Sequence, residues 1–241
     1  MTGFITINGV SSENFGVVLS DANVYGKAER DVQNISVPGR SGDLIIDNNR
    51  YKNVKFEYPC LIVGDFDNNF SAFINYILSQ NGYMRIEDSF HPDEFVLARY
   101  VGETNTNRVK RDRIGSFKLT FDRKPQRYLK SGEEKITFTA NGQFINNEQT
   151  YALPLVRVYG TGSVGIGDQT ITINSLASGA AYTDIDCDVQ DAFYGTTNCN
   201  GNITLSSGSF WKIHPGTNGV NGFSNTSNIT RVEITPRFWR L

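Results

Sequence analysis

Four aspartates in one short segment are the first residues of this sequence that could do chemistry. They are Asp184, Asp186, Asp188 and Asp191. If residues 184–188 form a strand, the first three carboxylates share one face, because successive side chains of a strand point to opposite sides. Carboxylates are good Ca²⁺ ligands, although a calcium-binding loop would need glycine and glutamate where this segment has Val189 and Gly195. The segment is either an opportunistic cation site or a solvated outer sheet face, and we expect the solvated face and no bound metal.

Nucleophilic and acid–base groups are sparse. The two histidines, His91 and His214, stand beside prolines in different halves of the chain. The three cysteines, Cys60, Cys187 and Cys199, lack metal-binding spacing, and their odd number is typical of free thiols in a reducing cytoplasm. A catalytic Cys–His or Ser–His pair would need a chance juxtaposition of these residues. We therefore predict that the protein is not an enzyme and uses no cofactor.

Two further patterns imitate ligand-binding motifs. Residues 160–165 match the G-x-G-x-x-G letters of a dinucleotide site, but such a site needs a helix after the glycines. Residues 169–174 alternate as a strand does, so we expect the glycines to make a hairpin. Trp211 and Trp239 could be sugar-stacking platforms or core residues, since large rings bury the most apolar area. Neither pattern singles out an active site.

The first half of the chain is predicted to mix strands with one helix. Apolar residues at helical spacing, from Phe66 to Leu78, predict a helix near 66–80 that Asp65 or Asp67 caps. Asn48-Asn49 is expected to reverse the chain between two strands. The strand-like segments of this half are 4–9 with its turn, 43–47, 52–63, 83–87, 94–101 and 114–122.

The second half is predicted to be an antiparallel β-sandwich. Glycine, asparagine and serine separate short strands, and no helical period appears. The polar stretch 124–134, with Pro125 and Ser131-Gly132 as breakers, suggests a domain boundary. We expect a mainly β protein with domains 1–130 and 131–241. The strand-like segments are 135–140, 154–160, 169–174, 182–189, 203–206, 210–213 and 229–236.

Composition excludes several classes of protein. The chain has 241 residues, of which 39% are hydrophobic and 12% aromatic, enough apolar material to build cores. Its net charge of −2 argues against a dedicated nucleic-acid binder. We expect no signal peptide and no membrane-spanning segment, because no apolar run approaches the required length. Synthesis in a cytoplasm follows from these expectations.

One stiff turn carries an exposed arginine between two strand-like runs. Residues 37–44 read Val-Pro-Gly-Arg-Ser-Gly-Asp-Leu. Pro38 fixes φ, and Gly39 and Gly42 allow the positive φ values of a sharp reversal. Arg40 is thereby presented to another surface rather than to its own core. The segment is either an ordinary surface turn or a contact site.

The same segment resembles the Pro-Gly-Arg-x-Gly-Asp signature of siphophage distal tail proteins, the Dit family. The chain's end, Pro236-Arg-Phe-Trp-Arg-Leu241, resembles their Pro-Arg-Trp-Trp-Arg close, with Phe238 where tryptophan is common. The resemblance spans nearly the whole chain in the family's order. The intervening matching segments are 138–142, 153–162, 182–186 and 214–218.

This resemblance implies a structural virion protein of the phage tail tip, assembled in the bacterial cytoplasm. The family combines an N-terminal β domain with one helix and a C-terminal galectin-like sandwich. Its members form a hexameric ring, or two stacked rings, that joins the major tail tube protein to the tail-associated lysin or fibre protein. In some phages receptor-binding proteins dock as well, and DNA passes through the lumen without specific binding or membrane contact.

The resemblance also suggests which residues form contacts between subunits. We expect a subunit interface at Pro38, Gly39, Arg40, Gly42 and Asp43, with Arg40 making a charge-assisted bond to a neighbouring subunit. The basic connection 102–113 is either a solvated hairpin arm or a second contact facing a neighbour or the lumen.

Two other functions are open to a β-sandwich protein of this kind. A carbohydrate-binding adhesin is the alternative, although the histidine, asparagine, arginine and tryptophan of a galectin sugar site are not found together in this sequence. A polysaccharide hydrolase would need a pair of carboxylates in a cleft, and no motif positions such a pair.

Overall fold

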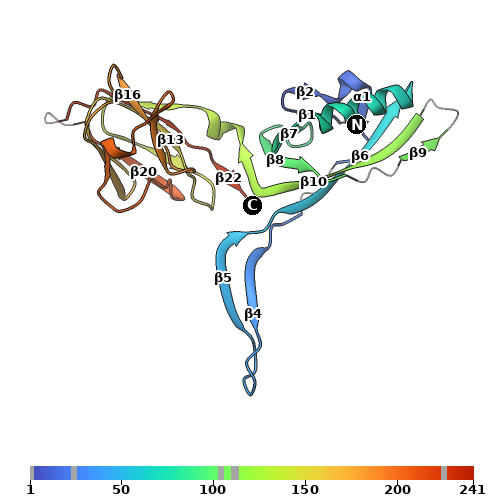
Figure 1. Ribbon diagram of the computed structural model, residues 1–241, viewed down its shortest axis with the longest axis horizontal. Helices are drawn as coiled ribbons and strands as arrows, with labels where there is room; N and C mark the ends of the chain where they lie inside the picture. Colours follow the sequence, from blue (N-terminus) through green and yellow to red (C-terminus); the bar gives the residue numbers. More distant parts are fainter. Residues whose placement is uncertain (1–2, 23–25, 103–105, 110–113, 224–226) are drawn as a thin grey trace. The chain divides into compact units, whose positions relative to one another are not determined.

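The computed structural model of the chain describes residues 3–22, 26–102, 106–109, 114–223 and 227–241 (Figure 1). Two compact units emerge from its internal contacts, Met1–Arg127 with Leu241 and Tyr128–Arg240. The described residues are mainly β and contain one α-helix, α1 (Phe66–Leu78), as the sequence predicts. No helix among them is long and apolar enough to cross a membrane.

A curved sheet forms the body of the first unit. Its path runs β2-β1-β7-β8-β10-β6-β3, with β9 pairing beside β10. An antiparallel bridge between Gly3 and Leu19 ties the segment before β1 to β3, so the two ends of the path approach each other. The strands are β1 (Ile5–Ile7), β2 (Val10–Ser11), β3 (Val17–Leu19), β6 (Val54–Val63), β7 (Met84–Asp88), β8 (Glu94–Tyr100), β9 (Thr106–Val109) and β10 (Ile114–Leu129).

Alternating burial along the strands builds the core of this unit. In β6 every second side chain, including Tyr58 and Ile62, is buried, which matches the period of a strand with one face on a core. The helix α1 adds Phe66, Phe73 and Ile77 to the same cluster. The carboxylate of Asp65 accepts the Asn68 N–H at 3.3 Å and caps the helix. The predicted helix, its apolar face and one of its two candidate caps are confirmed.

The second unit is a sandwich of two antiparallel sheets. One follows β11-β21-β13-β16-β17-β18, and the other β12-β20-β14-β15-β19. Inward side chains of both sheets, such as Val156 and Val164, share one buried cluster with Trp211. The antiparallel sandwich predicted for this half is confirmed.

The remaining elements complete the chain. The first sheet of the sandwich comprises β11 (Ile136–Phe138), β13 (Leu155–Tyr159), β16 (Tyr182–Asp186), β17 (Asp191–Tyr194), β18 (Thr197–Asn198) and β21 (Arg231–Thr235). The second comprises β12 (Gly142–Asn146), β14 (Gly162–Ile166), β15 (Gln169–Ile173), β19 (Ile203–Leu205) and β20 (Gly216–Asn221). Outside them lie β4 (Arg30–Ile35), β5 (Leu44–Tyr51) and three 3₁₀ turns, η1 (Ser12–Phe15), η2 (Lys130–Glu133) and η3 (Asn200–Asn202). The short strand β22 (Trp239–Arg240) pairs with β10.

Two expectations about chain breaks are wrong. Asn48 and Asn49 do not reverse the chain but lie within β5, because residues 37–42 make the reversal instead. Pro125 does not break β10, which continues to Leu129. The ladder between β10 and β6 ends at Arg123, so the missing N–H of Pro125 costs no hydrogen bond to β6.

The strand predicted at 210–213 is also absent. Only an isolated bridge between Ala152 and Ile213 forms there. The Trp211 side chain is fully buried, and its indole N–H donates to the Gln169 carbonyl at 3.2 Å. The segment is therefore held in place by the buried Trp211 ring and not by the hydrogen bonds of a regular strand.

The segment that leads into the sandwich crosses the last residues of the chain. The Leu129 N–H donates to the Phe238 carbonyl at 2.9 Å, and the Arg237 N–H donates to the Gly132 carbonyl at 2.7 Å. A Cβ at Gly132 would overlap the Phe238 backbone nitrogen. Position 132 therefore has no room for a side chain larger than that of glycine.

We predict that Gly132→Ala destabilises the second unit by about 1–3 kcal/mol, because a methyl group would push two backbones apart. Gly201→Ala is the matched control, since a Cβ there meets no atom within 4 Å. Urea unfolding of both variants and the parent measures the difference. Equal midpoints for the two variants would show that the crossing tolerates a side chain.

Candidate assembly interface

β4 and β5 form a two-stranded ribbon, which we call the arm (residues 30–51; Figure 1). Among the described strands they pair only with each other. Every residue from 33 to 50 is exposed. The arm therefore has no core of its own.

The predicted turn forms the tip of the arm. The Arg40 N–H donates to the Val37 carbonyl at 3.1 Å, which closes a four-residue turn. Pro38 holds its second position, and Gly39, with φ of +80°, holds its third. Positive φ at the third position defines a type II turn, for which proline followed by glycine is the preferred pair. Gly42 also has a positive φ, +85°, so both glycines act through backbone conformation.

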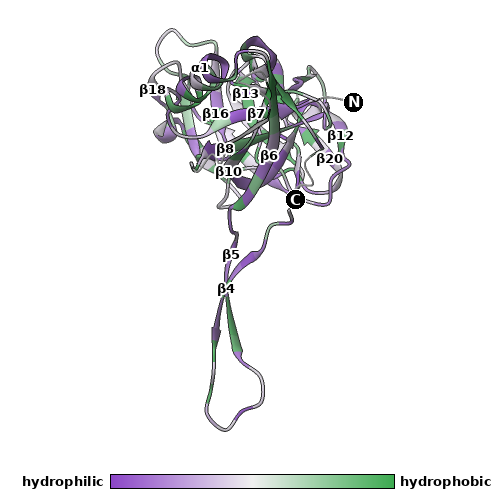
Figure 2. Cartoon of the chain, turned by 90° about the vertical axis from the view of Figure 1, so that its right-hand side faces the viewer, coloured by the Kyte–Doolittle hydropathy of each residue, from purple (hydrophilic) through white to green (hydrophobic). Residues whose placement is uncertain are grey.

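One face of the arm is aliphatic. Ile35 lies opposite Leu44 in the ladder, and Gln33 lies opposite Ile46. Side chains opposite each other or two positions apart along a strand share a face, so Ile35, Leu44 and Ile46 line one side. Their exposed fractions are 42%, 44% and 43%. Figure 2 shows this hydrophobic colour on the distal part of the arm.

Ion pairs brace the part of the arm nearest the sheet. Arg30 pairs with Asp47 at 2.8 Å, and Arg50 pairs with Asp31 at 2.6 Å. The hydrogen bond from Arg50 lowers the pKa of Asp31. Between these pairs the ladder is irregular, and Asn49 has φ of +55°. Such a bulge changes the local twist of a ribbon.

A buried arginine anchors the start of the arm. Arg123 is completely buried in β10 and donates to the carbonyls of Gly26, Lys124 and Pro125 at 2.9–3.0 Å. Burying a charge is unfavourable unless hydrogen bonds compensate it, so these carbonyls fix the chain at Gly26. Sequence analysis missed Arg123, because nothing in the local pattern distinguishes it from exposed basic residues nearby.

The acidic segment is neither a cation site nor the solvated face that we expected, because Asp184 is buried, Asp186 is partly buried, and arginines pair with both. Both Asp184 oxygens accept from the Arg157 guanidinium at 2.8 and 2.9 Å. Both Asp186 oxygens accept from Arg237 at 2.7 and 2.8 Å. Asp188 lies in a turn beyond the end of β16. Within the described ranges, no group of three acidic, histidine or cysteine residues could hold a metal ion.

The other candidate residues are dispersed. Trp211 lies in the core, and His214 faces Asp168 at 3.5 Å. His91 lies in the first unit, where its ring nitrogen contacts Asp88 at 2.9 Å. The glycines at 160–165 do not form the turn of a hairpin as predicted. Gly160 lies in the connection between β13 and β14, which belong to different sheets, and Gly162 and Gly165 lie within β14. The hairpin of β14 with β15 turns at Gly167 and Asp168 instead, and no helix follows the glycines as a dinucleotide site would need. All three cysteines are buried free thiols.

Comparison with known proteins identifies the fold. The sequence matches no family model and no curated protein. The crystal structure of the Dit protein of phage SPP1 matches over 100% of both chains, with a TM-score of 0.70 and 13% sequence identity. That protein is described as a paradigm of the hub adsorption apparatus in phages infecting Gram-positive bacteria. The fold is that of a Dit protein.

Two structures of the phage P2 baseplate in its activated conformation agree with this assignment. The Ca-bound structure matches 97% of this chain and 96% of its own, with 13% identity and a TM-score of 0.50. The Sr-bound structure matches 100% and 98%, with 14% identity and a TM-score of 0.50. The Dit-like fold therefore extends over both units of the chain, while most side chains differ.

The Asp186–Arg237 pair makes a pH-dependent contribution to stability. Burial alone would raise the pKa of Asp186, but hydrogen bonds and charge from Arg237, with the N–H groups of Asp188 and Val189, outweigh burial and lower it. A carboxyl with a lowered folded-state pKa stabilises the fold above its ordinary pKa of 3.8 and loses that contribution as pH falls through the lowered value.

We therefore expect Asp186→Asn to lower the free energy of unfolding by about 1–3 kcal/mol at neutral pH, with the deficit shrinking below about pH 4. Denaturant unfolding from neutral pH to strongly acidic pH measures this deficit. The control is Glu134→Gln, an exposed carboxylate elsewhere on the same unit without an ion pair among the described residues, for which no such deficit is expected. A deficit for Asp186→Asn that stays constant with pH would mean that the pair acts by packing alone.

Proposed function

We propose that this chain is a structural, non-enzymatic phage protein that forms the hexameric hub at the distal end of a siphophage tail. Residues 1–130 would build the ring, and residues 131–241 would form the docking sandwich. The observation that carries the proposal is the exposed aliphatic arm on a full-length Dit-like fold. A coreless ribbon of this kind is marginally stable in water and needs a partner surface.

A second copy of the chain is the partner that the arm fits. In a closed ring every subunit offers the same surfaces, so each arm meets an identical acceptor on its neighbour. At the tip, Arg40 and Asp43 are exposed, and neither has an ion-pair partner among the described residues. Their charges are available for a charge-assisted contact across the interface. Pro38, Gly39 and Gly42 would hold the tip in the required shape.

The hub would link the major tail tube protein to the tail-associated lysin or fibre protein and, in some assemblies, to receptor-binding proteins. Its lumen would let DNA pass, and the net charge of −2 supports a conduit over a DNA-binding channel. The connection 102–113 stays a second candidate contact, although residues 103–105 and 110–113 lie outside the described part. This function places the protein in the virion, at the tail tip.

The alternative of a galectin-type adhesin has weak support. Trp211 cannot stack on a sugar, because it is completely buried in the sandwich core. His214 is near Trp211 in sequence, but it is on the surface beside Asp168. No aromatic–histidine constellation of the galectin type therefore exists at these residues.

The mass of the native protein tests the proposed function most directly. We expect native mass spectrometry and light scattering of the purified full chain to give the mass of one hexamer or of two stacked hexamers. A protein that stays monomeric at the highest attainable concentration would contradict the hub.

Arm variants test the interface. Replacing Ile35 and Leu44 together with aspartate should disrupt the ring, because carboxylates would occupy an apolar contact. Arg40→Glu should shift the assembly midpoint to at least about tenfold higher concentration. Ile145→Asp is the control, as Ile145 is 58% exposed on the sandwich and outside the arm. If both arm variants assemble as the parent does, the arm is not the subunit contact.

A further inference from the structure

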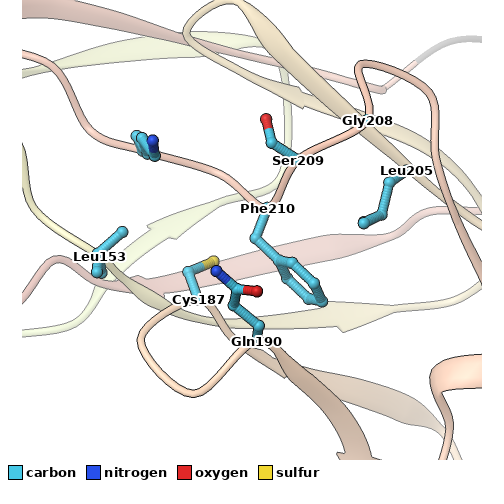
Figure 3. Close-up of a pocket in the computed structure, with 8 residues that line it drawn as sticks. Leu153, Cys187, Gln190, Leu205, Gly208, Ser209 and Phe210 are labelled. Carbon is cyan, nitrogen blue, oxygen red and sulfur yellow. The ribbon is translucent and has the colours of Figure 1, made fainter.

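The second unit contains a small pocket with a volume of about 180 Å³ (Figure 3). Its lining comes from three places in the sequence: Leu153, two residues before the start of β13, the turn after β16, and the last residue of β19 with the segment that follows it. Leu153, Leu205 and the ring of Phe210 supply apolar surface. The volume suits one small ring and is too small for a drug-sized ligand.

Three residues with polar side chains also line the pocket. They are Gln190, Ser209 and Lys212. Among the described residues, the side chains of Gln190 and Ser209 have no hydrogen-bond partner. The Lys212 nitrogen lies 5.4 Å from the ring centroid of Tyr151, which is an exposed residue.

These unengaged groups contrast with the outer face of the sheet β12-β20-β14-β15-β19. There the Ser163 and Thr172 hydroxyls bond to each other at 2.8 Å, and the Asn174 amide donates to Thr204 at 2.9 Å. The polar groups of that face largely satisfy one another. The side chains of Gln190 and Ser209 at the pocket, by contrast, remain able to form hydrogen bonds with a ligand.

Gln190 is also held in an uncommon conformation. Its φ is +58°, a left-handed value that residues other than glycine rarely adopt. Figure 3 shows its amide beside the Phe210 ring and Cys187. Strained backbone positions persist where the surroundings enforce them, and they cluster at binding sites.

The pocket lining carries one charged side chain. Lys212 contributes a positive charge, and the lining includes no carboxylate. Burial, aided by the charges of Asp186 and Asp188, raises the pKa of the Cys187 thiol to about 12, so no thiolate is present at neutral pH. Asp186, outside the lining, is paired with Arg237.

We propose that this pocket binds one neutral sugar ring of a surface glycan. The apolar face of a pyranose would lie against Phe210 and Leu205, while its hydroxyls would bond to Gln190, Ser209 and Lys212. The exposed ring of Tyr151, next to Lys212, offers a stacking surface for a second sugar unit. This activity goes beyond the hub function, because it would let the sandwich touch the host surface directly.

An apolar side chain from a partner protein fits the pocket less well. Inserting it would desolvate the Gln190 amide and the Ser209 hydroxyl without supplying hydrogen bonds, which is unfavourable. The residues that dominate protein interfaces are tryptophan, tyrosine and arginine, and none of them lines the pocket. A polyol satisfies both the apolar and the polar parts of the lining.

The test is saturation-transfer NMR of the full-length protein with glucose, galactose and N-acetylglucosamine, each at millimolar concentration, and with glucuronate as a charged comparison. We expect weak binding of at least one neutral sugar and at least about tenfold weaker binding by Gln190→Ala/Lys212→Ala. The matched control, Gln143→Ala/Lys135→Ala, removes an exposed amide and an exposed ammonium group elsewhere on the same unit and should bind as the parent does. Thermal unfolding checks that both variants remain folded.

Four results would overturn the proposal. They are no binding of any neutral sugar, binding of glucuronate alone, sugar binding that the pocket variant retains, and equal loss of binding in the control variant. Co-purification with tail-tip proteins gives a separate readout. If the pocket variant loses a protein partner while the parent binds no sugar, the pocket is a protein anchor instead. Since none of these substitutions touches the arm, failure of this proposal leaves the hub function unaffected.

Discussion

No apolar layer from the described residues covers the aliphatic face of the arm, which Ile35, Leu44 and Ile46 make. Hydrogen bonds between two strands do not compensate for exposing this surface, and a lone ribbon is marginal in water. We therefore propose that another molecule covers the arm in the assembled state. The proposed ring of identical subunits would meet this requirement without any additional protein, and the tip turn would hold its charged residues at the end of the contact.

This constraint also explains the buried arginine at the start of the arm. A ribbon can hold a defined position in an interface only if its base is fixed to the rest of the unit. Arg123 fixes the chain at Gly26 by donating a hydrogen bond to the Gly26 carbonyl. The pairs Arg30–Asp47 and Arg50–Asp31 stiffen the adjoining ribbon, although exposed ion pairs contribute little stability. In the proposed ring, most of the energy that orders the arm would come from apolar contacts with the neighbouring subunit.

The sandwich uses its polar groups in a different way. On one sheet arginines engage the carboxylates, and on the other hydroxyl and amide groups engage each other. The polar and charged groups named here are therefore paired with one another on the outer face of each sheet. The pocket beside Phe210 is distinctive because its amide and hydroxyl are not engaged in this way. If the proposed sugar site is present, binding by this unit depends on which polar groups the fold leaves unpaired.

Local chemistry by itself determined a good part of this protein. The apolar spacing from Phe66 to Leu78 set the helix, because side chains three and four apart must share a face. Proline followed by glycine at 38–39 set the tip turn, because few other pairs fit its dihedral angles. Strand alternation in the second half set an antiparallel sandwich for the same local reason.

Only the tertiary structure decided which residues meet. Arg157 and Arg237 reach Asp184 and Asp186 from strands and segments distant in sequence, so the aspartate pattern alone could not tell a cation site from ion pairs. The course of β5 through Asn48-Asn49 depends on its register with β4, and the burial of Trp211 depends on two sheets closing over it. Periodicity acts between neighbours along the chain, whereas pairing and burial are set by contacts that form only when distant segments come together.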